Sequence, residues 1–257
     1  MKLTKDNYHS PEANWHYMSV SQFKAFEKCP AAAMAELRGE YQREKTTALL
    51  VGSYVDSYFE GTLKEFKEES PEIFKENGEL KAEYCHAEKI IERVKQDKLF
   101  MHYMSGLKQV IMTGNIKGVP VKIKIDSLLK EAIVDGKIVK DFEPIYVADK
   151  GKVPWFEAWG YDLQGAVYQE IVLQNIGKQL PFYLAPATKE KEPDLDIVHI
   201  GQLYLDYAME HFEEKVALYD AIKKGILEPE RCEKCEYCKR TKILTAPTEA
   251  EEYYFID

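Results

Sequence analysis

The stretch IDSLLKEAIVDGK, residues 125–137, decides the fold, because two apolar segments in it flank a polar centre. Apolar and polar residues alternate on both sides of that centre, which predicts two antiparallel strands joined by a tight turn. A turn centred on Lys130 and Glu131 places Asp126 directly opposite Asp135. The Cβ atoms of such cross-strand partners lie about 4.5–5.5 Å apart, so the sequence predicts two neighbouring carboxylates.

A pair of facing carboxylates destabilises a sheet unless a cation lies between them. Mg²⁺ resolves that conflict, because it is a hard cation that one or two carboxylates hold together with phosphate oxygens and water. Lys137 is two residues beyond Asp135 and therefore points to the same face of the strand. A hairpin with solvated charges is the alternative. The apolar run Ala-Ile-Val before Asp135 favours a central strand and a functional site.

The segment after the hairpin adds polar residues that can reach the same place. Residues 155–176 predict a long amphipathic helix, in which Gln164 and Tyr168 are i,i+4 neighbours on one face. This polar pair either lines the metal site or forms a surface contact, and the spacing fits both.

Aromatic residues gather where this helix begins. Trp155, Phe156 and Trp159 could stack on unpaired bases. Their spacing of three to four residues is more typical of a helix face buried in a core, and we predict core positions for them.

The rest of the chain extends this core in both directions. Its 257 residues, of which 45% are hydrophobic, suffice for a single large domain with a full core. The pattern predicts a mainly helical N-terminal part over residues 1–100 and a C-terminal helix with a cysteine-rich tail over 206–257. The α/β core between them, residues 101–205, has a mixed central sheet flanked by helices. Residues 109–129 and 132–139 alternate and predict three antiparallel strands, of which the last two form the hairpin. The core also contains the helix and two more strands over 181–188 and 196–205.

Composition and missing motifs exclude several classes of protein. The formal net charge of −9 argues against a protein that coats duplex DNA, although an enzyme could still bind a few phosphates in a cleft. No apolar run approaches the roughly 18–20 residues that cross a bilayer, and the N-terminal sequence lacks the apolar centre of a signal peptide. Neither GxSxG, Walker A, GxGxxG nor paired histidines occur, which argues against serine hydrolases, ATPases, dinucleotide enzymes and histidine-built zinc enzymes. We expect a cytoplasmic protein that is not bound to a membrane.

Taken in order, the segments resemble the PD-(D/E)xK nuclease superfamily, and within it the RecB-type and RecE-type phage exonucleases, close to the RecE C-terminal-like family. The resemblance runs from about Met18 to Lys242 and implies a restriction-endonuclease-like core. It is carried by VGSYVDSYFEG (51–61), GVPVKIKIDSL (118–128), AIVDGK (132–137) and GYDLQGAVYQEIV (160–172).

The resemblance implies a role for each polar residue of the hairpin and the helix. In that superfamily the two acidic residues bind the catalytic metal, which makes Asp126 and Asp135 the expected ligands of Mg²⁺ or Mn²⁺. The backbone carbonyl after the second acid, here that of Gly136, often adds a ligand, and the lysine assists the attacking water. The residues implied as catalytic are Asp126, Asp135, Lys137, Gln164 and Tyr168.

Three positions depart from the superfamily pattern. Many RecB-type members carry a metal-binding histidine on an early helix after a Gly-Ser step, whereas this sequence has Asp56 in that place. Aspartate can also ligate a hard cation, so Asp56 joins the expected metal site. Ile125 stands where the name-giving proline would be, and Gly136 where a bulky apolar residue is common. Neither change removes a catalytic group.

The cysteines form a second candidate site. Cys232, Cys235 and Cys238 have CxxCxxC spacing, which can surround one soft metal ion or a cluster if a fourth ligand exists. Cys29, just before Pro30, is the candidate for that fourth ligand. The arrangement resembles a subset of RecB-type nucleases in which one early and three late cysteines hold an iron–sulfur cluster. A [4Fe-4S] cluster is therefore implied, with Zn²⁺ and unliganded reduced thiols as alternatives. The odd number of cysteines in the chain favours a reduced compartment.

The resemblance also implies a biological role. The expected activity is Mg²⁺-dependent hydrolysis of phosphodiester bonds, as a DNA exonuclease that works from DNA ends in phage or prophage recombination. The implied partner is a single-strand annealing protein, and related enzymes are homo-oligomers that enclose DNA. The alternative is a non-catalytic DNA-binding or assembly module on the same fold, in which the cysteine-bound metal or iron–sulfur cluster is the main feature.

Overall fold

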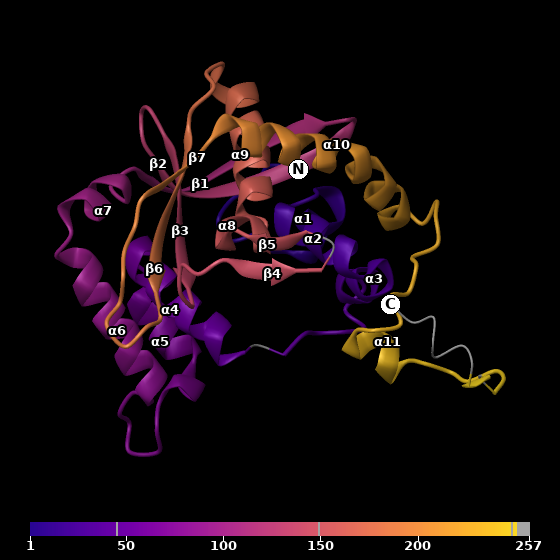
Figure 1. Cartoon of the computed structure of the whole chain (residues 1–257), viewed down its shortest axis with the longest axis horizontal. Helices are drawn as coiled ribbons and strands as arrows, with labels where there is room; N and C mark the ends of the chain where they lie inside the picture. Colours follow the sequence, from indigo (N-terminus) through magenta and orange to yellow (C-terminus); the bar gives the residue numbers. More distant parts are fainter. Residues whose placement is uncertain (45, 149, 248, 251–257) are drawn as a thin grey trace.

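The computed structural model of the chain describes residues 1–44, 46–148, 150–247 and 249–250. Its centre is a five-stranded sheet with the strand order β1-β2-β3-β6-β7. Helices cover both faces of this sheet (Figure 1), as the sequence predicts. The strands of the sheet are β1 (Leu107–Ile116), β2 (Val119–Leu128), β3 (Ile133–Val139), β6 (Phe182–Thr188) and β7 (Val198–Ile200).

The sheet is mixed, because one of its neighbouring pairs is parallel. β1, β2 and β3 form the predicted antiparallel meander, β3 pairs with β6 in parallel, and β6 pairs with β7 antiparallel. In the β2–β3 ladder Ser127 faces Val134 and Leu128 faces Ile133, which is the register that a turn centred on Lys130 and Glu131 requires. The hairpin predicted from the sequence is therefore confirmed.

The helices form two layers, one on each face of the sheet (Figure 1). A large apolar core lies between the sheet and α2, α3, α9 and α10, and a second core lies between the sheet and α4, α6 and α7. The helices are α1 (Pro11–His16), α2 (Val20–Lys28), α3 (Pro30–Leu37), α4 (Thr47–Glu60), α5 (Leu63–Glu69), α6 (Ala82–Lys95), α7 (Lys98–Tyr103), α8 (Trp155–Ala158), α9 (Tyr161–Ile176), α10 (Gln202–Lys223) and α11 (Glu236–Arg240), with a 3-10 turn, η1, over Pro71–Ile73.

Two helix boundaries show why the sequence folds as it does near the candidate site. Ser19 caps α2, since its hydroxyl accepts a hydrogen bond from the backbone N–H of Gln22. α4 ends at Gly61, whose left-handed conformation (φ 78°) suits glycine and closes the last turn of the helix. Both boundaries agree with the sequence pattern.

The structure corrects the predicted helix over residues 155–176. The segment forms two helices, α8 and α9, because Gly160 adopts a left-handed conformation (φ 62°) between them. The break also determines which of the aromatic residues are buried. Trp155 is buried as predicted, whereas Trp159 is 56% exposed and the prediction of a core position for it is wrong.

Two further elements differ from the prediction. The last strand stops at Ile200, because the residues that follow Gly201 bury an apolar stripe at helical spacing and begin α10. A small hairpin of β4 (Ile145–Val147) and β5 (Gly151–Val153) stands apart from the main sheet and was not predicted. Strands of three residues are too short to show a periodic pattern.

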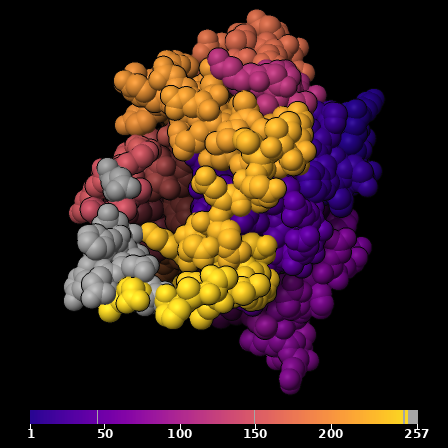
Figure 2. Space-filling model, turned by 90° about the vertical axis from the view of Figure 1, so that its right-hand side faces the viewer, coloured from indigo at the N-terminus to yellow at the C-terminus, as the bar shows by residue number. Residues whose placement is uncertain are grey.

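An N-terminal helix and the last described helix meet on one side of the molecule. α11 contacts α3, and the C-terminal segment lies against the N-terminal part in the space-filling view (Figure 2). No helix in the described ranges has both the length and the apolar character needed to span a bilayer.

Candidate active site

The candidate site lies where β2 and β3 separate. Beyond the pair formed by Ser127 and Val134 the two strands diverge, so Asp126 and Asp135 are not joined by ladder hydrogen bonds. The backbone N–H of Gly136 instead donates to Asp126 Oδ2 at 3.1 Å. The predicted register thus brings the two carboxylates to one opening between the strands.

Asp135 is the most deeply buried acidic group of this opening, with an exposed fraction of 1%. Its burial raises the pKa of the carboxyl to about 7, against the lowering effect of Lys137. Gln164 Nε2 donates to Asp135 Oδ1 at 2.8 Å. Asp135 Oδ2 pairs with the ammonium group of Lys137, and a carboxylate oxygen has a second lone pair with which it can bind a further ligand.

Lys137 supplies the fixed positive charge of the site. Burial disfavours its charged form, but the nearby carboxylates of Asp135 and Asp126 outweigh that effect and raise its pKa. Its Nζ lies 4.9 Å from the ring centroid of Tyr161, a distance at which a cation is attracted to the aromatic face. These contacts hold the ammonium group beside Asp135.

α9 contributes both members of the predicted polar pair, but only one of them reaches a carboxylate. Gln164 contacts Asp135 directly. The hydroxyl of Tyr168 donates to the backbone carbonyl of Lys124 at 3.0 Å, and burial raises its pKa, so it remains a neutral donor. Tyr168 therefore holds α9 against β2, next to the residue that orients Asp135.

α4 adds acidic side chains from the opposite side of the cleft. Asp56 is open to solvent on one side, yet its burial among the cleft walls and repulsion from Asp126 raise its pKa to about 8. Glu60, one helical turn further on, also has a raised pKa because of burial and Asp126. Both line a small cavity with Asp126. Sequence reasoning missed Glu60, although its i,i+4 spacing from Asp56 was visible.

Gln109 on β1 is a further residue that the sequence did not indicate. It is buried and has a positive φ of 54°, a conformation that costs a non-glycine residue about 1–3 kcal/mol. Its Nε2 donates to Asp126 Oδ1 at 3.2 Å, while its Oε1 has no hydrogen-bond partner. The strained backbone therefore aims this amide at Asp126, and only the folded structure reveals it.

The donor set fits a hard divalent cation. Asp56, Asp126 and Asp135 share one cleft, and their mutual repulsion is the kind of conflict that a bound cation relieves. An ion held by one or two carboxylates and completed by a backbone carbonyl, water and phosphate oxygens is the arrangement that Mg²⁺ prefers.

The predicted cysteine site is assembled from both ends of the chain. The Sγ atoms of Cys29, Cys232, Cys235 and Cys238 all lie within 4.8 Å of one another. The Sγ of Cys238 is 3.5 Å from that of Cys29 and 3.9 Å from that of Cys232. Backbone N–H groups of Cys235 and Cys238 donate to the thiols of Cys232 and Cys235, at 3.3 and 3.4 Å.

The environment of these thiols differs from one to the next. Burial acts to raise the pKa of Cys232, but backbone N–H donors of Lys234 and Cys235 outweigh it and lower the pKa to about 6. Burial raises the pKa of Cys238 to about 12. The remaining cysteine, Cys85, is exposed on α6 and lies outside the cluster. The four clustered thiols could hold a soft metal ion in the way that backbone-supported thiolates do.

Comparison with known proteins gives two matches. The model of a family described as "PDDEXK-like domain of unknown function (DUF3799)" matches residues 19–241. A crystal structure of a protein from Eubacterium rectale, named "Putative exonuclease", is 48% identical to this chain, with a TM-score of 0.95 and 98% of each chain covered. No curated protein matches the chain significantly.

Proposed function

The chain belongs to the PDDEXK-like family DUF3799, and on this premise we propose that it is a metal-dependent DNA exonuclease. The observation that carries the proposal is the buried carboxylate of Asp135. Lys137 and Gln164 hold it beside Asp126, at the place where the central strands β2 and β3 separate. A charged lysine and two carboxylates in one cleft are suited to hydrolysis of a phosphodiester bond.

Each residue of the candidate active site has a distinct role in this proposal. Asp126 and Asp135, with the carbonyl of Gly136, would hold Mg²⁺ or Mn²⁺, and Asp56 would stand at the rim of the same site. The bound ion would lower the pKa of a water molecule and neutralise charge on the phosphate. Lys137 offsets the charge that develops on the phosphate during attack, and Gln164 fixes the orientation of Asp135.

The activity is tested with linear and covalently closed circular duplex DNA in the presence of Mg²⁺. We expect nucleotides to be released from the linear DNA only, and EDTA to stop the reaction. Cleavage of the circle would indicate an endonuclease. If well-folded protein releases nothing from either DNA with Mg²⁺ or Mn²⁺, the exonuclease proposal is wrong and a non-catalytic DNA-binding module takes its place.

We also propose the biological setting that the resemblance implies. The enzyme would act in the cytoplasm at DNA ends during phage or prophage recombination, together with a single-strand annealing protein and as a homo-oligomer. A pull-down with a purified single-strand annealing protein tests the partner, and sedimentation of the purified protein tests the assembly. A monomer at micromolar concentration would contradict the oligomer.

For the cysteine site we propose one structural metal centre. Four thiolates about 2.3 Å from a tetrahedral Zn²⁺ lie roughly 3.8 Å apart. Two pairs of thiols in this cluster are 3.5 and 3.9 Å apart, and all four lie within 4.8 Å of one another, which supports a single ion. A [4Fe-4S] cluster requires wider spacing, because iron and sulfide ions fill the space between the thiolates. Metal analysis and a visible absorption spectrum after anaerobic purification distinguish the two: zinc without colour supports the single ion, and a brown protein with iron supports the cluster.

A further inference from the structure

A large cavity opens beside the carboxylate cleft and carries exposed aromatic side chains. It has a volume of about 920 Å³ and lies between α2, the junction of α8 and α9, and the first turns of α10. Figure 2 shows a hollow between the orange α10 and the salmon segment around residue 150. Trp159 is 56% and Tyr207 64% exposed in this cavity, and Tyr204 is exposed as well. We call it the aromatic groove.

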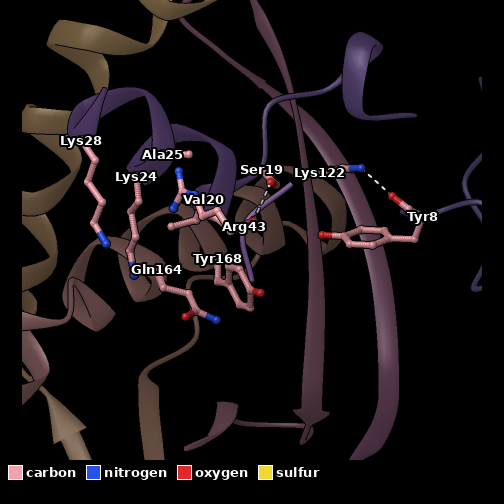
Figure 3. A pocket seen from close by; sticks show the side chains of 11 residues that line it. Tyr8, Ser19, Val20, Lys24, Ala25, Lys28, Arg43, Lys122, Gln164 and Tyr168 are labelled. Atoms are coloured by element: carbon pink, nitrogen blue, oxygen red, sulfur yellow. Dashed lines mark hydrogen bonds between the residues drawn. The ribbon is translucent and has the colours of Figure 1, made fainter. Parts of the chain in front are cut away.

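A smaller cavity adjoins the aromatic groove and is lined by positive charge. It has a volume of about 280 Å³ between α2, β2 and α9 (Figure 3), and we call it the basic pocket. Its charged residues are Lys24, Lys28, Arg43 and Lys122. Arg43 pairs with Glu36, and buried Lys122 donates to Tyr8 and Asn14, so Lys24 and Lys28 are the cations that a ligand can reach. No acidic residue is among the lining side chains. This is unusual in a chain with 44 acidic and 35 basic residues, and it suits an anionic group.

The two cavities meet at the candidate active site. They share Lys24 and Lys28, whose side chains point from α2 toward Gln164 in Figure 3. Gln164 lines the basic pocket and also donates to Asp135. Tyr161 lines the aromatic groove and contacts Lys137 with its ring. Each cavity is therefore lined by a side chain that touches a residue of the candidate active site.

Two of the three acidic residues that line the aromatic groove have basic partners, and the third, Asp162, accepts a hydrogen bond from the backbone N–H of Leu163. Glu157 pairs with Lys150 at 3.2 Å. Glu27 contacts His211 at 2.5 Å and Lys215 at 3.9 Å. These carboxylates are paired with other residues. Lys28 has no ion pair in the described part of the chain, so its ammonium group is available for a ligand.

From this arrangement we propose that the two cavities together bind an unpaired DNA strand next to the bond that is cleaved. The basic pocket takes a phosphate of that strand, and the aromatic groove takes bases, which stack on Trp159 and Tyr207. Stacking on aromatic rings and contact of lysines with the backbone are the two means by which proteins bind single strands without sequence preference. The proposal rests on the proposed nuclease function and adds the form of the substrate: the end of the duplex is unpaired before cleavage.

The aromatic groove is tested by binding a fluorescein-labelled oligothymidylate of about 12 nucleotides in EDTA, so that hydrolysis plays no part. We expect Trp159→Ala and Tyr207→Ser each to raise the Kd for this oligonucleotide about tenfold, because a base loses its stacking partner. The matched control is Tyr146→Ser on β4, since Tyr146 is 74% exposed and lies outside both cavities. Its Kd should equal that of the wild type, and equal melting temperatures show that all variants fold.

The basic pocket is tested through the salt dependence of the same binding. Lys28→Gln should reduce the slope of log Kd against log salt concentration by about 0.7, the contribution of one phosphate contact in a single strand. Tyr207→Ser should leave the slope unchanged, and so should Lys89→Gln, which removes an exposed lysine from α6 on the other face of the sheet. A terminal and an internal phosphate are distinguished by comparing oligonucleotides with and without a 5′-phosphate.

The outcomes separate this proposal from the proposed activity. If Trp159→Ala, Tyr207→Ser and Lys28→Gln bind the oligonucleotide like the wild type while the wild type degrades linear DNA, the strand site is wrong and the exonuclease stands. If the binding effects occur but no hydrolysis is found, the strand site stands without the nuclease. The wild type could also bind a blunt duplex of the same length more tightly than the oligonucleotide. If all three variants then lose affinity for the duplex, the cavities bind paired DNA and the proposal is overturned.

Discussion

Lys122 on β2 is a lysine with almost no contact with solvent. Its exposed fraction is 2%, and its Nζ donates to the backbone carbonyl of Tyr8 and to Asn14 Oδ1, so it fastens the N-terminal segment onto the sheet. Burial lowers its pKa to about 8, from the usual 10.5. The folded state therefore holds the proton of this lysine less tightly than the unfolded state does.

This difference gives a pH dependence of stability with a definite sign. Between pH 8 and 10.5 the unfolded chain binds more protons at this position than the folded protein, so the free energy of unfolding rises with pH. The free-energy cost of burying the charged lysine is fully present below pH 8 and disappears as the pH passes 10.5. From pH 8 to pH 10 we expect the wild type to gain about 2 kcal/mol relative to Lys122→Met, measured by urea unfolding. A Lys89→Met variant, which changes an exposed lysine, should keep the wild-type profile; parallel curves for Lys122→Met and wild type would contradict the assignment.

The residues of the site differ in how far the sequence could predict them. Asp126, Asp135 and Lys137 lie within twelve residues on one hairpin, so strand alternation and turn position suffice to place them. Gln109 could not be predicted, because its approach to Asp126 depends on a left-handed backbone conformation inside a strand. The contact between Tyr161 and Lys137 depends equally on how α9 packs over the sheet.

Among the elements, α9 packs more closely than its sequence shows. Gly165 lies where a Cβ atom would come within 2.4 Å of Phe182 and 2.9 Å of Leu205, so the helix meets β6 and α10 only because this position has no side chain. Gly52 in α4 has the opposite environment, since a Cβ there would meet nothing within 4 Å. The same residue type thus has opposite effects in two helices.

Replacement of both glycines by alanine tests this difference. Gly165→Ala should lower the free energy of unfolding by about 1–3 kcal/mol, because the added methyl group overpacks the interface. Gly52→Ala should raise it by about 0.5–1 kcal/mol, because alanine is the better helix former and the space is open. Thermal or urea unfolding of the two variants measures both changes. A stabilised Gly165→Ala protein would show that the interface of α9 is looser than the structure indicates.

The elements predicted from the sequence are those with a repeating apolar pattern. β1, β2 and β3 alternate over seven to ten residues, so these three strands were placed correctly. The hairpin of β4 and β5 and the break between α8 and α9 depend on a few local backbone angles. Such short features carry no periodic signal, and tertiary contacts decide them.

At the scale of the whole molecule, the cysteine site joins the two ends of the chain. Cys29 and Cys238 are separated by most of the sequence, yet their thiols are 3.5 Å apart. The backbone N–H of Ala31 also donates to the carbonyl of Glu230 at 3.0 Å. Because few other apolar residues pack in this small cluster, we infer that a bound metal supplies much of its stability.

Removal of one thiol should therefore loosen the end of the chain. We expect Cys29→Ser to lower the melting temperature by at least about 5 °C and to expose the segment around α11 to protease, because a site with three thiols binds metal more weakly. Cys85→Ser, at the exposed cysteine on α6, is the control and should melt like the wild type. Equal melting temperatures for Cys29→Ser and the wild type would mean that the cluster holds no structural metal.

The central claim is that Asp135 acts in hydrolysis and not in holding the fold. Its carboxylate is buried near Asp126 and Asp56, and burial with this repulsion outweighs the attraction of Lys137, so Asp135→Asn removes a charge that is disfavoured on balance. The most direct measurement is the rate of nucleotide release from linear duplex DNA in Mg²⁺ by this variant and by the wild type, with the melting temperature of each. We expect the rate to fall by at least about a thousandfold, while the melting temperature stays equal or rises. A folded Asp135→Asn enzyme that retains its rate within tenfold would contradict the assignment of the site.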